Sequence, residues 1–214
     1  MVTRGFCLSL PVCLGLRGGV SVVVVTEASG DGSSRWRTFG ERTIYDSPEV
    51  WLGQVDVGLP DGERIWRHVV RLQRAAAMVL IDEEDRVLLL WRHRFVQDRW
   101  GWELPGGLVD EDEDPREAAA RELEEQTGYR AGHLGHLVSF QPVAESADGE
   151  HVVFVGRDGE RTGDAISSEG INSSEWVPLE WVPVLIAAGK IWNSATLVGL
   201  LQMLAQNGYS AAGG

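Results

Sequence analysis

Acidic and amide side chains share one face of a predicted helix near the middle of the chain. In the stretch RELEEQTGY, Arg121–Tyr129, the residues Glu122, Glu125 and Gln126 are spaced i, i+3, i+4 and so lie on the same side of a helix. Neighbouring carboxylates on an exposed helix repel each other by about 0.2–0.5 kcal/mol per pair. A bound divalent cation reverses that sign, and Mg²⁺ prefers oxygen ligands of this kind. The spacing predicts a metal-binding face, with a solvated acidic face as the alternative.

A glycine-rich turn precedes this helix. The stretch GWELPGGLVDEDEDP, residues 101–115, contains Gly106 and Gly107, and Glu113 lies just before the predicted helix start. Glycine allows the backbone to approach closely and leaves its carbonyl oxygen accessible as a further ligand. This combination of loop and helix favours the metal site over the solvated face.

Gln126 is a neutral group among the acids. An amide oxygen can bind a metal ion, but it contributes no negative charge. We therefore expect weaker occupancy of one metal position, with slower turnover or an altered metal preference. A site that has lost catalysis and only binds nucleotide is the alternative.

From Gly107 to Tyr129 the sequence resembles the Nudix box, G-x5-E-x7-R-E-U-x-E-E-x-G-U, in which U is an apolar residue. It departs from that pattern by placing Gln126 where the box has its last glutamate, and Tyr129 is a mild variation. The resemblance implies a hydrolase that uses Mg²⁺, or alternatively Mn²⁺. Such an enzyme cleaves the pyrophosphate bond of a nucleoside diphosphate linked to another moiety, giving NMP and a phosphorylated product. A catalytically weakened or inactive nucleotide-binding module of the same fold is the alternative.

The same resemblance assigns roles to single residues. It makes Glu122 and Glu125 catalytic residues and the main carboxylate ligands. The carbonyl of Gly106 and the side chain of Gln126 belong to the same metal set. A later acid acts as base or ligand, and Glu169 fits that place best. Competing acids in the loop after Pro142 are Glu145, Asp148 and Glu150. Residues with structural roles are Gly107, Glu113, Arg121 and Gly128.

Weaker similarity extends from about Arg42 to Leu204. It rests on RHRF before ELPGG, on SFQPVAES after the box, and on GKIWNSATLVGLL near the end. These segments resemble ADP-ribose pyrophosphatases and related nucleotide-sugar hydrolases, although Val143 stands where the usual glycine follows the proline. The resemblance implies an N-terminal β-segment that helps to build a homodimer. The predicted substrate-binding residues, two of them at a strand edge beside the box, are Arg92, Arg94, Glu103 and Pro142.

Local signals predict the elements that position these residues. The apolar runs 75–82 and 86–95 are expected to be buried strands. Asp114 can cap a helix that begins at Pro115 and ends before Gly128. A hairpin turn is expected at residues 60–62 and a last helix at 194–206. With the resemblance, this order implies an α/β (α+β) fold, a Nudix-type α/β/α sandwich with a mixed β-sheet and a small N-terminal β-segment.

The expected domain organisation has four parts. They are an N-terminal extension and linker (1–35), a β-segment for possible dimerisation (36–72), a Nudix hydrolase domain (73–208) and a tail (209–214). Arg4 and the apolar run after it are similar to a secretory signal, but Pro11 and Arg17 interrupt that run. We therefore expect residues 1–25 to be an extension.

Composition limits the partners. The chain has 214 residues and a formal net charge of −13, so it has no general attraction for nucleic acid or for an anionic membrane. The expected partners are a small nucleoside diphosphate derivative and a second copy of the chain. Cys7 and Cys13 show no metal-ligand spacing, which favours a reducing, cytoplasmic location.

Overall fold

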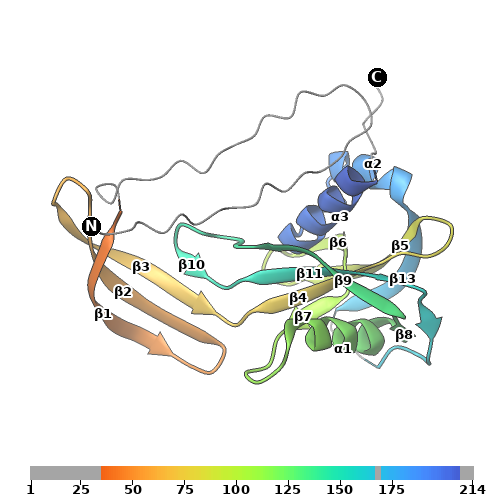
Figure 1. Cartoon of the computed structure of the whole chain (residues 1–214), viewed down its shortest axis with the longest axis horizontal. Coiled ribbons are helices and arrows are strands. Elements are labelled where there is room, and N and C mark those ends of the chain that lie inside the picture. The colour runs from red at the N-terminus through yellow and green to blue at the C-terminus, as the bar shows by residue number, and fades with distance from the viewer. Residues whose placement is uncertain (1–34, 167–169, 208–214) are drawn as a thin grey trace, which may run out of the picture. The chain divides into compact units, whose positions relative to one another are not determined.

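A computed structural model describes residues 35–166 and 170–207 (Figure 1). The predicted tail, and the predicted extension up to residue 34, lie outside these ranges. The strands are β1 (Arg37–Asp46), β2 (Val50–Gly58), β3 (Arg64–Leu72), β4 (Ala75–Leu80), β5 (Arg86–Arg94), β6 (Arg99–Glu103), β7 (Gly106–Leu108), β8 (Tyr129–Arg130), β9 (His133–Phe140), β10 (Ala147–Asp148), β11 (His151–Arg157), β12 (Glu160–Arg161) and β13 (Ile171–Pro178). The helices are α1 (Pro115–Thr127), the 3-10 turn Leu179–Trp181, α2 (Val182–Ala187) and α3 (Ser194–Gln206).

A mixed four-stranded sheet forms the middle layer, with the strand order β7-β4-β11-β9. β4 and β11 are parallel, whereas β7 and β9 are antiparallel to their neighbours. In this register Ala76 lies opposite Gly107 and Ala77 opposite Gly106, so the glycine turn of the box belongs to the sheet. The predicted mixed sheet is confirmed.

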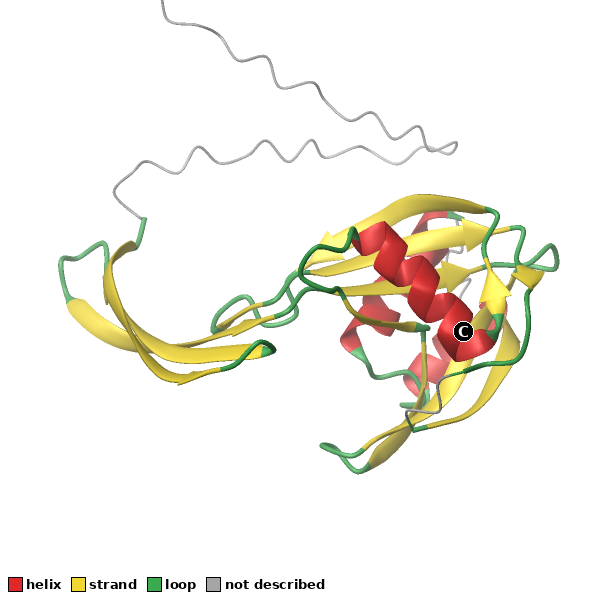
Figure 2. Cartoon of the chain, turned by 90° about the horizontal axis from the view of Figure 1, so that it is seen from below, coloured by secondary structure: helices red, strands yellow, loops and turns green. Residues whose placement is uncertain are grey.

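Side chains of β4 alternate between two apolar cores, as the period of a strand requires. Met78 packs in one core with Leu123 of α1. Val79 packs in the other with Leu200 and Met203 of α3. α1 and α3 therefore cover opposite faces of the sheet, α1 below and α3 above in Figure 1. Figure 2, turned by 90°, shows the helices against the strands from a second side. This is the predicted α/β/α sandwich.

A second sheet has the order β13-β5-β6 and is antiparallel throughout. β5 carries Arg92 and Arg94, and β6 ends at Glu103. Because β5 is the middle strand of this sheet, the prediction that these arginines lie at a strand edge was wrong.

The N-terminal strands form their own sheet, β1-β2-β3-β10. Gly62, with φ 92°, lies in the turn between β2 and β3, as predicted. Strand β10 joins β3 in parallel and so ties the loop after Pro142 to this sheet.

Capping fixes both ends of α1 and the start of α3. The Asp114 carboxylate accepts a hydrogen bond from the amide of Arg116, and Pro115 occupies the first turn. Gly128 ends α1 with φ 72°, a left-handed conformation that glycine adopts without strain. Asn193 caps α3 by accepting from the amide of Thr196 at 3.2 Å.

Within residues 35–166 and 170–207, no helix combines the length and the apolar character that crossing a membrane would require.

Candidate active site

Glu122 lies against the glycine turn that β7 contributes. A Cβ atom built on Gly107 would lie 2.4 Å from Oε1 of Glu122. A Cβ atom on Gly106 would lie 2.4 Å from the backbone oxygen of Ala76. Glycine is therefore needed at both positions, at Gly107 for the carboxylate and at Gly106 for the sheet.

Arg121 connects the box loop to the acidic face of α1. Its Nε and Nη2 atoms each donate to the Glu113 carboxylate at 2.9 Å. These bonds lower the pKa of Glu113 and raise the pKa of Arg121. Nη1 donates to Glu122 at 2.9 Å and lies 3.6 Å from Oε2 of Glu125. One guanidinium thus draws the two catalytic candidates together, which supports the structural role expected for Arg121.

The two carboxylates suit a divalent cation that needs few protein ligands. Among the described residues, no group of three or more His, Cys, Asp or Glu side chains could hold a metal ion. Mg²⁺, however, is commonly held by one or two carboxylates and completes its shell with water and substrate phosphates. Glu122 and Glu125 approach the same guanidinium nitrogen, and the Glu125 side chain is 41% exposed. The donor set therefore fits Mg²⁺ or Mn²⁺ held jointly with a phosphorylated ligand.

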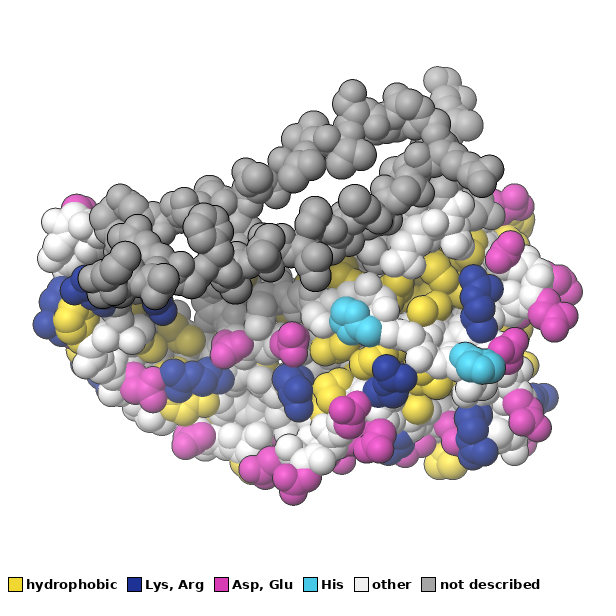
Figure 3. Space-filling model, in the orientation of Figure 1, with side chains coloured by type: hydrophobic (Ala, Val, Ile, Leu, Met, Phe, Trp, Pro, Cys, Tyr) yellow, Lys and Arg dark blue, Asp and Glu magenta, His cyan; other side chains and the backbone are white. Residues whose placement is uncertain are grey.

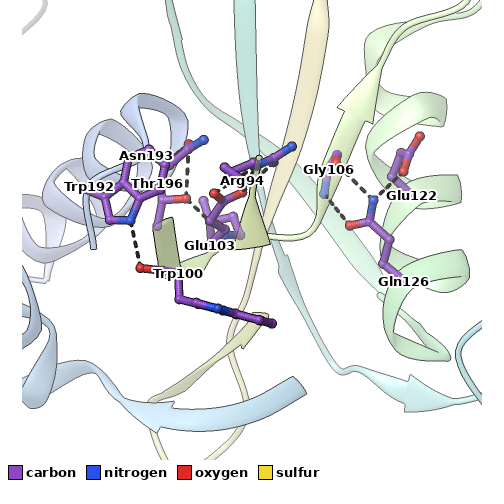
Figure 4. Close-up of polar contacts among 10 residues, drawn as sticks. Arg94, Trp100, Glu103, Gly106, Glu122, Gln126, Trp192, Asn193 and Thr196 are labelled. Atoms are coloured by element: carbon purple, nitrogen blue, oxygen red, sulfur yellow. Dashed lines mark hydrogen bonds and ion pairs between the residues drawn. The ribbon is translucent and has the colours of Figure 1, made fainter. Parts of the chain in front are cut away.

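Gln126 is buried between α1 and the glycine turn, with an exposed fraction of 2%. Its Oε1 accepts from the Gly106 amide at 3.0 Å, and its Nε2 donates to the Gly106 carbonyl at 3.1 Å. The same Nε2 donates to Glu122 at 2.7 Å (Figure 4). Every polar atom of this side chain is engaged with a neighbouring predicted site residue.

A pocket of about 490 Å³ opens beside Glu122. Its walls come from β4, β5, the β6–β7 turn, α1, the start of β11 and the start of α3. They include the predicted site residues Arg92, Arg94, Glu103, Gly106, Gly107 and Glu122. Residues far apart in the sequence therefore meet around one cavity large enough for a nucleotide derivative.

Glu103 and Arg94 form an ion pair in the wall of this pocket. The Glu103 side chain is 2% exposed, and it accepts from Nε of Arg94 at 3.0 and 3.1 Å and from Nη2 at 2.5 Å. A buried carboxylate needs such a partner, because an uncompensated charge in a poorly hydrated site is costly. Glu103 therefore orients Arg94, whose own side chain is 42% exposed.

The start of α3 forms the opposite wall, which sequence reasoning missed. Thr196 accepts from the Leu104 amide at 3.0 Å, and Trp192 donates from Nε1 to the Trp100 carbonyl at 3.2 Å (Figure 4). These bonds fix Asn193 at the pocket. In the sequence, the segment GKIWNSATLVGLL indicated only the resemblance and the helix expected at 194–206, and neither assigned Asn193 or Thr196 to the site.

His151, at the start of β11, is a second residue that the sequence did not single out. Its ring packs edge-on against Phe140, and it lines the pocket. Burial lowers the pKa of His151, so the neutral imidazole is favoured. Its Nδ1 atom is buried, and no described residue supplies a hydrogen-bond partner for it. A lone histidine in a strand carries no spacing from which this position could be found.

Several predicted residues lie elsewhere. Pro142 does not line the pocket, and neither do the competing acids Glu145, Asp148 and Glu150. Asp148 lies on β10, where it accepts from Gln141 at 3.2 Å. Glu169 lies outside the described residues. Gly128 acts at the end of α1, away from the pocket.

Charge on one face of the molecule is mixed. Figure 3 shows acidic and basic side chains interspersed over the face that it draws. With a net charge of −13, attraction for a polyanionic ligand must come from groups at the site itself.

Comparison with known proteins gives independent evidence on the family. The family model described as the NUDIX domain matches residues 71–197. A CMP-5′-(N-acetyl-N-hydroxy-3-aminopropyl)phosphonate hydrolase of Streptomyces rubellomurinus is 42% identical over 174 residues, which cover 81% of this chain and 84% of that protein. An ADP-ribose pyrophosphatase of Mycobacterium tuberculosis is 28% identical over 169 residues, which cover 78% of this chain and 82% of that protein.

A solved structure titled "Crystal structure of ADP compounds hydrolase" superimposes with a TM-score of 0.69 at 19% identity, covering 82% of this chain and 97% of that one. It supports the fold alone. The match of the family model and the 42% identical relative confirm the predicted family, and relatives named as ADP-ribose pyrophosphatases support the predicted branch. The chain belongs to the Nudix family of hydrolases.

Proposed function

We propose that this chain hydrolyses a P–O–P bond that joins a nucleoside 5′-phosphate to another phosphate or phosphonate group, with Mg²⁺ or Mn²⁺ as cofactor. The observation that carries the proposal is that Glu122 and the box glycines share a 490 Å³ pocket with Arg92 and Arg94. Acidic groups for a cation and basic groups for phosphate oxygens thus border the same cavity.

The residues of the site divide the work between them. Glu122 and Glu125 hold the cation, which when bound stabilises negative charge on the phosphate oxygens. Arg94, oriented by Glu103, binds phosphate or ribose oxygens, and Arg92 lies on the same strand face. In the reaction, a water oxygen bonds to one phosphorus and the bridging P–O bond breaks. NMP and the phosphorylated partner are then released.

Relatives indicate the range of substrates to test. One relative is named for a CMP-linked phosphonate and others for ADP-ribose. The shared chemistry is a nucleoside monophosphoryl group attached through an anhydride bond. We therefore propose substrates of this class, with a cytosine nucleotide and an adenine nucleotide as the first two candidates. We also propose a cytoplasmic location.

The test compares product release from ADP-ribose and from a CMP-linked phosphonate, with Mg²⁺ and with Mn²⁺. Chromatography should show AMP or CMP in the native reaction. Glu122→Gln should lower kcat/KM by at least about 100-fold, the scale of losing one group that stabilises transition-state charge. Glu117→Gln is the matched control, because Glu117 is exposed in the first turn of the same helix. Equal activity of the native chain and Glu122→Gln would contradict the proposal.

A nucleotide-binding module without catalysis is the second candidate, and the neutral Gln126 favours it. This candidate predicts that the native chain binds ADP-ribose or the CMP-linked phosphonate in calorimetry but releases no NMP with either cation.

We further propose that the N-terminal sheet joins two copies of the chain. Every residue of β1 is exposed, and apolar side chains that are about half exposed gather in β1 and β3. They are Phe39 (54%), Ile44 (56%), Tyr45 (55%) and Trp66 (46%). Aromatic side chains of this kind are enriched in interfaces between proteins.

Light scattering coupled to size exclusion tests the dimer. The native chain should have twice the mass of one chain, and the Ile44→Asp variant should have the mass of a single chain. Val143→Asp is the control, because Val143 is similarly exposed (51%) but lies outside β1–β3. A monomeric native chain would contradict this part of the proposal and leave the hydrolase assignment untouched.

A further inference from the structure

The Gln126 amide nitrogen lies where oxygen atoms of the predicted metal set converge. It donates to the Gly106 carbonyl at 3.1 Å and to Oε2 of Glu122 at 2.7 Å. Both oxygens belong to residues expected to bind the cation. The amide nitrogen therefore already occupies the space between two candidate metal ligands (Figure 4).

Chemistry fixes the orientation of this amide. The Gly106 N–H can only donate, so the atom that faces it at 3.0 Å must be the amide oxygen. The Gly106 carbonyl can only accept, so the NH₂ group must face it. The third bond, to Glu122, then follows from the same orientation.

A glutamate at position 126 could not make these contacts. One carboxylate oxygen could still accept from the Gly106 amide, but the other would face a carbonyl oxygen and the Glu122 carboxylate. Three acceptors without a donor repel each other in a site where residue 126 is 2% exposed. A positive ion between them would restore attraction.

We infer that the NH₂ group of Gln126 takes the place of one divalent cation, so that this chain binds one cation fewer than its Gln126→Glu variant. The inference rests on the proposed function, because it concerns the metal set of the same site. The remaining cation position is the one bordered by Glu122 and the more exposed Glu125. A carboxylate with a divalent cation carries a net charge of +1, whereas the amide is neutral. The site with Gln126 therefore has one positive charge fewer. Arg92 and Arg94 are then a larger part of what attracts the phosphates.

A purely structural role is the rival explanation, because the amide also fastens α1 to β7. Both explanations predict that Gln126→Met destabilises the chain, since the Gly106 amide and carbonyl lose their partner. They differ for Gln126→Glu. If the role is only structural, Gln126→Glu weakens the contact between α1 and β7 and binds no additional cation.

The experiment counts bound Mn²⁺ by electron paramagnetic resonance of the free ion, with a methylene analogue of ADP-ribose present. The native chain, Gln126→Glu and Gln126→Met are compared after purification in Mn²⁺, so that a variant that needs the ion can fold. We expect Gln126→Glu to bind one more Mn²⁺ per chain than the native chain, and Gln126→Met to bind no more than it. The melting temperature of Gln126→Glu should also rise more steeply with Mn²⁺.

Each outcome separates this inference from the proposed function. Equal counts for the native chain and Gln126→Glu would overturn the inference, and so would an extra ion in Gln126→Met. If the native chain bound no ion but Gln126→Glu bound one, the inference would hold and the proposed cation dependence would fail. No ion in any of the three would overturn both.

Discussion

Replacing Gly107 by alanine should reduce activity without unfolding the chain. The added Cβ would lie 2.4 Å from Oε1 of Glu122, about 1 Å short of the 3.4 Å at which ordinary contact begins. The atoms it meets first belong to the end of a side chain, so the Glu122 carboxylate can retreat by about that distance. In an enzyme, a 1 Å misplacement of a reacting group costs about 100-fold in rate. We expect kcat to fall by about this factor.

Two other glycines serve as controls for this prediction. Gly40→Ala meets nothing within 4 Å and should leave both activity and stability unchanged. Gly106→Ala meets the backbone of Ala76 at 2.4 Å and of Ala77 at 2.7 Å, so it should lower the melting temperature. Gly107→Ala should melt within a few degrees of the native chain, because φ at Gly107 is not positive and alanine fits that backbone.

The assay follows NMP release from ADP-ribose or the CMP-linked phosphonate at saturating Mg²⁺, with thermal unfolding followed by circular dichroism. A Gly107→Ala variant that kept a kcat within threefold of native would refute the reasoning. Such a result would mean that the position of the Glu122 carboxylate does not limit the reaction.

Two further predictions concern the pocket wall. Arg94→Met should lower the free energy of unfolding by about 3 kcal/mol in urea titrations, because it leaves the buried Glu103 carboxylate unpaired. The double variant Arg94→Met/Glu103→Gln should recover part of this loss. If it recovered none, the ion-pair argument would be contradicted. His151 should destabilise the native chain as the pH falls below 6.5, because its lowered pKa makes the unfolded chain take up the proton first. Between pH 7.5 and 5, the unfolding free energy of His151→Phe should not show this loss of stability. His133→Phe, which changes a side chain that is 87% exposed, should still show it. If the unfolding free energies of the native chain and His151→Phe fell in parallel with pH, His151 would not be the group responsible.

Local signals were sufficient to predict helices α1 and α3. Asp114, Pro115 and Gly128 mark both ends of α1, and the structure has the helix at Pro115–Thr127. The last helix also begins and ends where it was expected, at Ser194 and Gln206. Capping depends on neighbours in the sequence, so these boundaries can be predicted from sequence.

Strands β6 and β7 were missed, because Gly101, Gly106 and Gly107 have low strand propensity and suggest a turn. Tertiary pairing with β5 and β4 overrides that propensity. The same reason explains the missed pocket wall. His151, Asn193 and Thr196 reach the pocket through the packing of β11 and α3, and no spacing in the sequence encodes that contact.

The box face could be predicted, whereas the detailed role of Gln126 could not. Helical spacing places Glu122, Glu125 and Gln126 together. That the Gln126 amide bonds both backbone groups of Gly106 depends on the distance between α1 and β7, which only the folded chain defines.

The central claim is that a strongly acidic chain binds a polyphosphate through a cation held by Glu122 and Glu125. Its most direct test is the affinity for a non-hydrolysable methylene analogue of ADP-ribose, measured by calorimetry with Mg²⁺ and with EDTA. We predict that Mg²⁺ tightens binding by about 5–150-fold, the usual range of coupling between two ligands, and that Glu122→Gln/Glu125→Gln loses this gain. The same affinity in Mg²⁺ and EDTA for the native chain would contradict the account.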